Sequence, residues 1–379
     1  MRILHVIGTI VRRRGGPVAA LAGVIALSDR LGYQSSVLTV RLPGEEHRYP
    51  PATTIHRMPV SFPARAMASR SAAHWMARHH ADYDLIVLHE SYSFAVLQVG
   101  RRLLRCTTPY VMVPHASLHP SNLIRKATLK HLLGRTCIAP LLRQTRMVWT
   151  TSELERSQLQ LFSATPRTLV LPLPVEPPAH PGDRARFRHL LGAADDDLLV
   201  AFAGRFDRVK QVGLLIRAVA ACLARHPRLR LVLAGAGDAA AEKDLRALVA
   251  ASGLAARTTF TGFIDAAARN DLLAGCDLFA MPSAWENFSV ASVEAMQAGV
   301  PVLLSRNIGI GAAVVAAEAG WVCEPRLPDF ADALAAIASA PAELSRRAGN
   351  ARRLGASYAP SVLMECYATA IHQAADRHA

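Results

Sequence analysis

The sequence predicts an α/β protein with two Rossmann-like domains. Short apolar runs, typical of buried parallel strands, alternate with helical stretches through both halves of the chain. The 379 residues are enough for two domains of ordinary size, and five prolines between Pro172 and Pro181 mark a linker near the middle. We therefore expect one domain over residues 1–175 and a second over residues 176–360.

The composition indicates a globular protein with large apolar cores. Hydrophobic residues make up 51% of the chain and charged residues 19%. The apolar runs are broken well short of the roughly 18 residues of a membrane-spanning helix, and Met1–Ile7 has a strand pattern too short for a signal peptide. Six cysteines are scattered without a C-x-x-C pair, which disfavours a zinc site or a disulfide framework and fits a reducing cytoplasm.

The positive charge is confined to the first half. Residues 1–175 hold 22 Lys and Arg against 8 Asp and Glu, whereas the remainder holds 21 of each. Such asymmetry is typical of a domain that meets a polyanion or an anionic membrane surface. A basic surface that only keeps the protein soluble is the alternative.

The first domain offers candidate groups where its expected strands end. The strand over residues 2–7 leads into a loop with Gly15 and Gly16, which let a backbone approach a phosphate closely before a helix begins. The strand over residues 84–88 ends in His89 and Glu90, which are possible acceptor contacts or an ordinary helix-start turn. The strand over residues 110–113 is followed by His115, a side chain able to donate or accept near neutral pH.

Two stretches of the first domain have the pattern of basic helices. Residues 63–80 can form an amphipathic helix that lies on an anionic membrane or on the domain itself. Residues 123–133 carry Arg125, Lys126 and Lys130, with Arg135 just beyond, and suit an acceptor that bears a phosphate or a lipid diphosphate.

The second domain begins with a strand over residues 199–203 that ends in Gly204 and Arg205. Lys210 follows five positions after Arg205, and a helix begins shortly after it. Two cations placed across one loop can hold a diphosphate from two sides and neutralise its charge. A surface-charged loop is the alternative.

The stretch from Asp277 to Pro301 reads as strand, loop, helix and strand, a βαβ unit with its loop at a strand's carboxyl end. Glu286 lies in the loop and Glu294 eight positions later in the helix; carboxylates there can accept sugar hydroxyls. The free amides of Phe288, Ser289 and Val290 at the helix start favour an anion.

Together these elements resemble the GT-B-fold glycosyltransferases of the large family 4 (group 1) type, which are retaining enzymes. Glu286-Asn287-Phe288-Ser289 through Glu294 is similar to their E-x7-E signature, which more often reads Glu-Gly-Phe-Gly. Pro114-His115-Ala116-Ser117-Leu118 resembles their Pro-His-Gly-x-Leu segment, with Ala116 in place of the glycine. Arg205 with Lys210, and Gly15 with Gly16, resemble the family's diphosphate-binding and glycine-rich loops.

The resemblance implies two Rossmann-like domains that face each other across a cleft, and a final helix over residues 361–379 that crosses back to the first domain. It also implies catalytic roles for His115 and Glu286, with Glu286 on the donor sugar. The donor-binding set implied is Gly15, Gly16, Arg205, Lys210, Phe263, Asn287, Phe288, Ser289 and Glu294, where Glu294 holds the ribose and Phe263 opens the loop beside the base.

The function expected from the resemblance is metal-independent transfer of a sugar, with retention, from a UDP or GDP sugar to a hydroxyl acceptor. No cofactor and no metal is expected, since the chain lacks an Asp-x-Asp motif at a strand end. The expected partners are the nucleotide sugar and a glycan, lipid-linked or small-molecule acceptor. We expect a cytoplasmic protein in bacterial surface glycan or glycolipid synthesis, with contact to the inner face of the membrane as a further option.

Three alternatives remain open from the sequence. A nucleotide-sugar epimerase of the same architecture would share the charged motifs and need no acceptor. A non-catalytic scaffold would tolerate Asn287 and Ser289 in place of glycines. A nucleic-acid-binding protein would explain the net charge of +14, but its basic residues lack interleaved aromatic residues.

Overall fold

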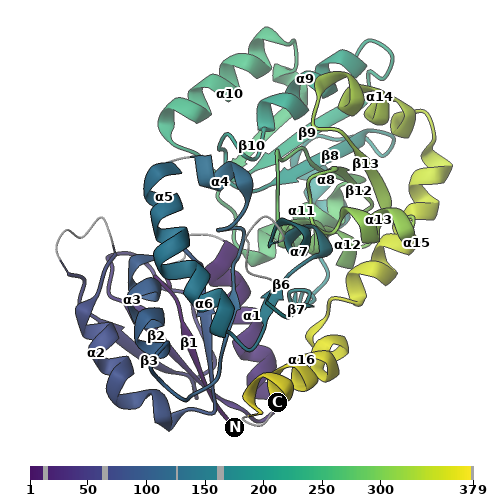
Figure 1. Ribbon diagram of the computed structural model, residues 1–379. Helices are drawn as coiled ribbons and strands as arrows, with labels where there is room; N and C mark the ends of the chain where they lie inside the picture. Colours follow the sequence, from purple (N-terminus) through teal and green to yellow (C-terminus); the bar gives the residue numbers. More distant parts are fainter. Residues whose placement is uncertain (12–15, 62–66, 125–126, 160–165, 377–379) are drawn as a thin grey trace. The chain divides into compact units, whose positions relative to one another are not determined.

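The computed structural model describes all residues except 12–15, 62–66, 125–126, 160–165 and 377–379. The chain divides into two compact units (Figure 1). Unit 1 comprises Met1–Pro174 together with the chain from Pro360 onward, and unit 2 comprises Val175–Ala359.

Unit 1 contains a seven-stranded parallel sheet in the order β3-β2-β1-β4-β5-β6-β7. The strand order reverses direction beside β1, as in doubly wound folds. The strands are β1 (Arg2–Val6), β2 (Gln34–Val40), β3 (Thr54–Met58), β4 (Leu85–His89), β5 (Tyr110–Val113), β6 (Val148–Thr150) and β7 (Thr168–Val170).

Helices cover both faces of this sheet, because alternate strand residues point to opposite sides. Ile86 and Leu88 of β4 pack with α2, α3 and α6, whereas Leu85 and Val87 pack with α1 and α16. The helices of unit 1 are α1 (Gly16–Arg30), α2 (Arg70–His79), α3 (Phe94–Leu103), α4 (Pro120–Ile124), α5 (Ala127–Leu133), α6 (Ala139–Gln144), α7 (Glu153–Leu159) and α16 (Pro360–Ala375).

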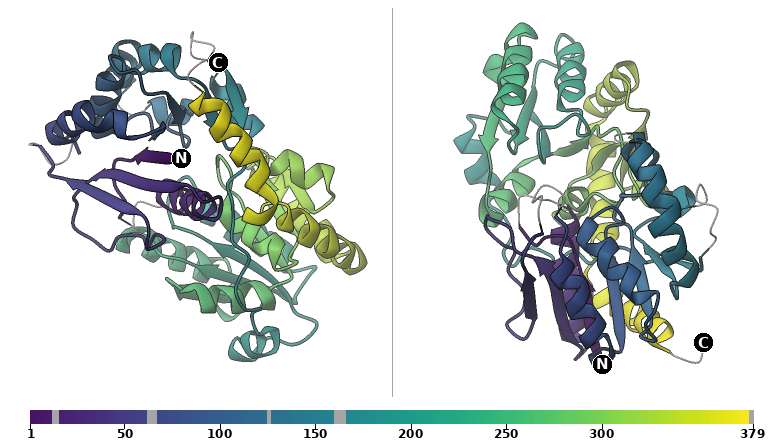
Figure 2. Two further views of the ribbon diagram at one scale, coloured as in Figure 1. Left: turned by 90° about the horizontal axis from the view of Figure 1, so that it is seen from below. Right: turned by 60° about the vertical axis from the view of Figure 1, so that its left-hand side comes forward.

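The last helix of the chain, α16, belongs to the core of unit 1. Its buried residues Leu363, Tyr367 and Ile371 pack with Ile3 of β1 and Leu27 of α1. The Tyr367 hydroxyl donates to the Pro172 carbonyl at 3.1 Å. Figure 2 shows this helix, in yellow, from two further sides.

Unit 2 contains a six-stranded parallel sheet in the order β10-β9-β8-β11-β12-β13, again reversing beside its first strand. Its strands are β8 (Leu198–Ala203), β9 (Leu229–Ala234), β10 (Thr258–Gly262), β11 (Leu278–Met281), β12 (Val302–Ser305) and β13 (Gly320–Cys323). Its helices are α8 (Arg184–Leu190), α9 (Val212–Cys222), α10 (Ala239–Ala251), α11 (Ala266–Gly275), α12 (Val290–Gln297), α13 (Gly311–Ala316), α14 (Leu327–Ala338) and α15 (Pro341–Ala356).

The two parallel sheets confirm the predicted fold class, but one strand was missed and one helix begins later than predicted. The missed strand is β3, which lies at the sheet edge. The helix predicted over residues 63–80 begins only at Arg70, capped by the Ser69 hydroxyl, and its apolar face (Ala72, Ala73 and Met76) is buried in the core rather than open to a membrane. Of the helix predicted over residues 123–133, the described parts are helical, as α4 and α5, and residues 125–126 lie outside the described residues.

Among the residues that the structure describes, no helix is both long enough and apolar enough to cross a membrane.

Candidate functional site

The most organised polar cluster of unit 2 lies where its strand order reverses, between β8 and β11. The loops after these two strands bring Lys210 and Glu286 together, although they lie 76 positions apart in sequence. The Lys210 ammonium donates a hydrogen bond to Glu286 Oε1, and each side chain is only 18% exposed. The Ser283 hydroxyl donates to the same carboxyl oxygen at 3.1 Å.

Backbone contacts hold these two loops in place. Asp207 Oδ1 accepts from the amides of Val209 at 3.0 Å and Lys210 at 3.1 Å. The Ala284 amide donates to the Val209 carbonyl at 2.7 Å, which ties the two loops to each other. Arg205, in contrast, is 66% exposed and pairs with Asp207 at 3.2 Å, so its guanidinium can meet a ligand from solvent.

The loop after β11 enters α12 through a residue with left-handed backbone. Ser289 has φ 80°, a conformation that explains why a glycine is usual at such a place. Its hydroxyl lies 2.7 Å from that of Ser292 rather than capping the helix. Phe288 is buried, with its ring edge-on to Tyr358. Asn287, beside it, is partly buried.

Glu294 lies in different surroundings from Glu286. It pairs with Arg269 of α11 at 3.1 Å, and burial raises the pKa of its carboxyl group while Arg269 opposes that rise. Both residues line a hollow of about 600 Å³ within unit 2, together with Glu176, Pro177, Pro178, Pro181, Gly182, Asn270, Leu273, Ala274, Gln297, Ala298 and Arg352.

Phe263 is a further candidate residue of unit 2, on the loop after β10. It follows β10, directly after Gly262 with φ 68°, and is 80% exposed. An aromatic ring so exposed is available for stacking on a flat ligand.

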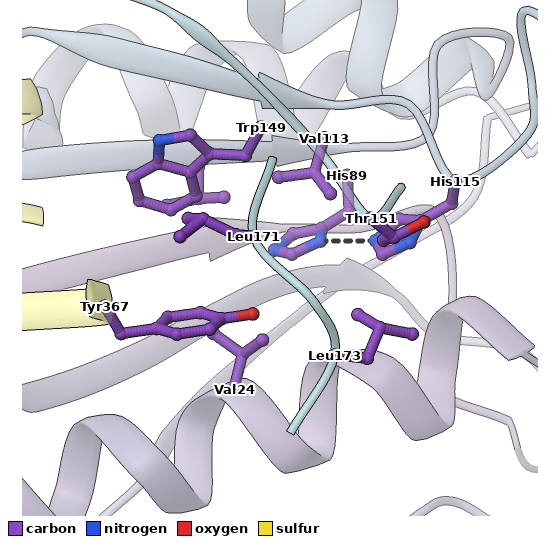
Figure 3. A pocket seen from close by; sticks show the side chains of 10 residues that line it. Val24, His89, Val113, His115, Trp149, Thr151, Leu171, Leu173 and Tyr367 are labelled. Carbon is purple, nitrogen blue, oxygen red and sulfur yellow. Dashed lines mark hydrogen bonds between the residues drawn. The ribbon is translucent and has the colours of Figure 1, made fainter. Parts of the chain in front are cut away.

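Unit 1 presents three histidines in series at the carboxyl ends of β1, β4 and β5. His5 Nδ1 lies 3.1 Å from His89 Nε2. His89 Nδ1 lies 2.9 Å from His115 Nε2, and Figure 3 marks this second hydrogen bond with a dashed line. His5 and His89 are 1% exposed, whereas His115 is partly exposed. Burial lowers the pKa of His5 to about 3 and that of His115 to about 4, and it lowers the pKa of His89 with help from both neighbours.

The loop that carries His115 is strained. His115 has φ 49° and Ala116 has φ 62°, so two consecutive residues with side chains adopt left-handed backbone. Each such residue costs on the order of 1–2 kcal/mol. Strain of this kind persists only where surrounding contacts hold it, and it is common at functional sites.

Glu155 of α7 supplies those contacts, and the sequence reasoning missed it. Its carboxyl group, 3% exposed, accepts from the Ala116 amide at 3.0 Å and from the Thr151 amide and hydroxyl at 2.8 and 3.0 Å. The Glu155 amide donates to Ser152 at 3.2 Å. A Ser-x-x-Glu spacing before a helix is the capping-box pattern, which could have revealed this residue.

A small cavity lies within unit 1, and both His89 and His115 line it. It has a volume of about 20 Å³, enough for one water molecule. Trp149 of β6 and Tyr367 of α16 form part of its mainly apolar wall (Figure 3). The remaining wall comes from Val24, Val87, His115, Val113, Thr151, Leu171 and Leu173.

The glycine-rich loop is only partly described. Gly15 lies outside the described residues, and Gly16 is the first residue of α1, with open space beside its Cα. Gly8, just after β1, has a clearer requirement, because a side chain there would collide with Ser93. Of the basic helix residues, Lys130 packs over the Tyr92 ring, Arg135 is exposed, and Arg125 and Lys126 lie outside the described residues.

Comparison with known families covers both units. Residues 15–176 match the family described as glycosyl transferase 4-like domain, and residues 183–354 match the family described as glycosyl transferases group 1.

Similar proteins include a D-inositol 3-phosphate glycosyltransferase of Rhodococcus opacus, 33% identical over 55% of this chain and 48% of that protein. Another of that name, from Stackebrandtia nassauensis, is 30% identical over 69% of this chain and 64% of that protein. The chain thus spans about half of the length of the first of these relatives and less than two thirds of the second.

Solved structures share the fold. Sucrose-phosphate synthase of Thermosynechococcus elongatus superposes with a TM-score of 0.83 at 20% identity, over 98% of both chains. Anabaena Alr3699/HepE in complex with UDP-glucose gives 0.78 at 20% identity, over 98% of this chain and 99% of that one.

Replacing Glu155 by Ala should destabilise unit 1 by about 3 kcal/mol, because three buried donors, two of them backbone amides, lose a charged acceptor. Urea denaturation measures this change. Glu153→Ala, in the same helix but 63% exposed, should cost well under 1 kcal/mol. Equal effects of the two substitutions would contradict the role assigned to Glu155.

Acid should destabilise the protein through the buried histidines. A histidine whose folded pKa is about 3 binds protons more weakly than in the unfolded chain. Its contribution to the free energy of unfolding is therefore fully present above pH 6.5 and is lost as the pH falls toward 3. For His5 this loss is on the order of 3–5 kcal/mol.

Urea denaturation of the full chain between pH 7 and pH 4 measures this dependence. His5→Phe should flatten it, whereas replacing the exposed His131 by Ala should leave it unchanged. A wild-type protein equally stable at pH 7 and pH 4 would contradict the assignment.

Proposed function

Since the chain belongs to the group 1 glycosyltransferases with a glycosyl transferase 4-like N-terminal domain, we propose that it transfers a sugar from a nucleoside diphosphate sugar to a hydroxyl acceptor. The observation that carries this proposal is the cluster of Lys210, Glu286 and Arg205 at the reversal of the strand order in unit 2. In open α/β sheets, ligands bind at this place.

The cations of unit 2 suit the diphosphate of the donor. Arg205 is exposed, and Lys210 is held beside it on the same short loop, so both can approach one diphosphate. Negative charge that develops on the leaving diphosphate is stabilised by such preorganised cations. The proposed reaction uses these side chains and the amides at the start of α12, proceeds with retention, and needs no metal or other cofactor.

The remaining groups have proposed roles in holding the substrates. Glu286 accepts hydroxyls of the donor sugar, Glu294 those of the ribose, and Phe263 stacks beside the base. His115 contacts the transferring sugar. Asn287, Phe288, Ser289, Gly15 and Gly16 complete the donor-binding set of this proposal.

Uridine is the base we propose to test first, because structures of the similar Alr3699/HepE contain UDP or UDP-glucose. The relatives named D-inositol 3-phosphate glycosyltransferase carry a phosphorylated acceptor in their name. A phosphate-bearing acceptor also fits the basic residues of unit 1. The proposed setting is synthesis of bacterial surface glycans or glycolipids on the cytoplasmic side.

The direct test is transfer itself. The chain is incubated with UDP-glucose, UDP-N-acetylglucosamine or GDP-mannose and a panel of glycan, lipid-linked and small hydroxyl acceptors. NMR of the product then reports the configuration at the anomeric carbon. Nucleotide release that requires an acceptor, with retention, supports the proposal; an altered nucleotide sugar without an acceptor would show an epimerase instead.

Nucleotide binding should depend on the proposed donor residues. One of UDP and GDP should stabilise the protein by about 3 kcal/mol at a hundred times its dissociation constant. Arg205→Ala and Glu294→Ala should each lose most of this stabilisation in a thermal shift assay. Arg208→Ala removes an exposed cation of the same loop and should keep it.

Two results would count against the assignment of the donor site. The first is the absence of a shift with either nucleotide. The second is equal loss of the shift in all three variants, which would indicate only a general charge effect.

The helices α4 and α5 of unit 1 also expose apolar side chains to solvent. Ile124 of α4 is 76% exposed, and Leu129 and Leu132, three positions apart on one face of α5, are 41% and 57% exposed. Exposed apolar residues next to cations such as Arg135 favour an anionic lipid surface. We propose that this patch, rather than α2, makes the peripheral membrane contact.

Flotation with vesicles tests this contact. Wild-type protein should bind vesicles of phosphatidylcholine with phosphatidylglycerol more than vesicles of phosphatidylcholine alone. The double substitution Ile124→Ser with Leu132→Ser should reduce binding at least fivefold, as expected when about two buried apolar side chains are lost. Leu190→Ser, 70% exposed in unit 2, is the control, and an equal loss there would refute the patch.

A further inference from the structure

The three histidines of unit 1 form one continuous chain of hydrogen bonds. His5 and His89 lie on the paired strands β1 and β4, and His115 lies in the loop after β5, which pairs with β4. The His89 and His115 rings lie edge to edge, with 14° between their planes and centroids 5.2 Å apart, and His89 Nδ1 lies 2.9 Å from His115 Nε2 (Figure 3). Both ring nitrogens of His89 are therefore hydrogen-bonded to other histidines.

The buried end of this chain is unpartnered. His5 Nε2 is buried, and no group in the described part of the chain makes a hydrogen bond to it. His5 uses its other nitrogen, Nδ1, for His89. The series of three hydrogen-bonded histidines thus has a buried end at His5 and a partly exposed end at His115.

A neutral imidazole has one N–H and one bare lone pair, so the hydrogen bonds must run in the same direction through all three rings. If each ring donates from Nδ1, His5 Nε2 is left as a bare lone pair. In the opposite direction, His5 Nε2 would be a buried N–H without an acceptor. Buried N–H groups without an acceptor are rarer than unused acceptors, which favours the first direction.

We propose that His5 and His89 are positioning residues that fix His115 in the tautomer with its proton on Nδ1, so that His115 presents a hydrogen-bond donor to its ligand. This role rests on the proposed function, in which His115 contacts the transferring sugar. The ligand atom would be an oxygen, either a sugar hydroxyl or a phosphate oxygen. His5 and His89 act through His115, and His5 itself touches no substrate.

The surrounding structure supports a fixed rather than an adjustable ring. Glu155 holds the Ala116 amide next to His115, and Ser117 donates to the Pro114 carbonyl at 2.6 Å. The backbone of His115 therefore cannot relax to suit another tautomer without breaking these contacts. The neutral form is also maintained, because a proton added at His115 Nε2 would meet the Nδ1–H of His89.

The test reads tautomers directly. In the full chain labelled with ¹⁵N-histidine, long-range ¹H–¹⁵N correlations at pH 7 should show His5, His89 and His115 with protons on Nδ1. His5→Phe removes the donor to His89 and should shift part of the His115 population to the Nε2–H form. His5→Asn keeps an amide N–H near the position of Nδ1 and should restore the wild-type pattern.

Activity provides the second readout. His5→Phe should lower kcat about tenfold, the scale seen when a partner that orients a functional histidine is removed. KM for the donor should stay within about twofold, because a positioning residue makes no contact with the ground-state donor. His56→Phe is the control: it replaces a partly buried histidine of unit 1 that is not one of the three hydrogen-bonded histidines, and it should change neither their tautomers nor kcat.

Three results would overturn the inference: a wild-type His115 protonated on Nε2, tautomers that are unchanged in His5→Phe, or His5→Asn behaving like His5→Phe. Circular dichroism and the unfolding midpoint establish that each variant is folded, and His5→Met serves if His5→Phe is not. If the tautomers follow the prediction but wild type transfers no sugar, the proposed function fails and the tautomer assignment stands.

Discussion

Parallel strand pairing is the constraint on which both units depend. Parallel neighbours cannot be joined by a tight hairpin, so each strand must return through a crossover, and all strands of a sheet end at the same edge. Where the strand order reverses, two crossovers leave in opposite directions, and no crossover connection passes over the strand ends between them. In unit 2 these ends carry Lys210 and Glu286; in unit 1 they carry His89 next to the strand of His5.

The pairing of Lys210 with Glu286 gives the proposed donor site a particular character. Two charges that are both mostly shielded from water are costly to separate, so neither side chain is free to turn away. Asp207 and Ser283 hold the same loops through their own hydrogen bonds. In the proposed reaction, a cation is therefore already aimed before any phosphate arrives, and little reorganisation is needed.

The sequence predicted what depends on periodicity and little of what depends on side-chain geometry. Alternating apolar runs were sufficient for both parallel sheets, and strand ends were sufficient to select Arg205, Lys210, Glu286 and His115 as candidates. The roles given to these residues remain proposals. Pairwise partners such as Arg269 for Glu294 could not be predicted, because they depend on how two helices pack rather than on local spacing.

Backbone strain was also beyond the reach of local patterns. Ala116 and Ser289 stand where the resembling motifs have glycine, and both nevertheless adopt positive φ. Propensity alone would forbid this, but contacts from elsewhere, such as that of Glu155, over-determine the loop around Ala116. The capping-box spacing around Ser152 could have pointed to Glu155, but its contact with the Ala116 amide, 39 positions away, has no local signal.

The place of α16 has a consequence for how the chain acquires its structure during synthesis. Leu363, Tyr367 and Ile371 are part of the same core as Ile3 and Leu27, so part of one face of the first sheet stays uncovered until α16 has been synthesised. Unit 2, by contrast, has its complete sequence available earlier. Strands that are translated before unit 2 thus belong to the unit that is completed after it, and the incomplete core of nascent unit 1 is prone to aggregation in the meantime.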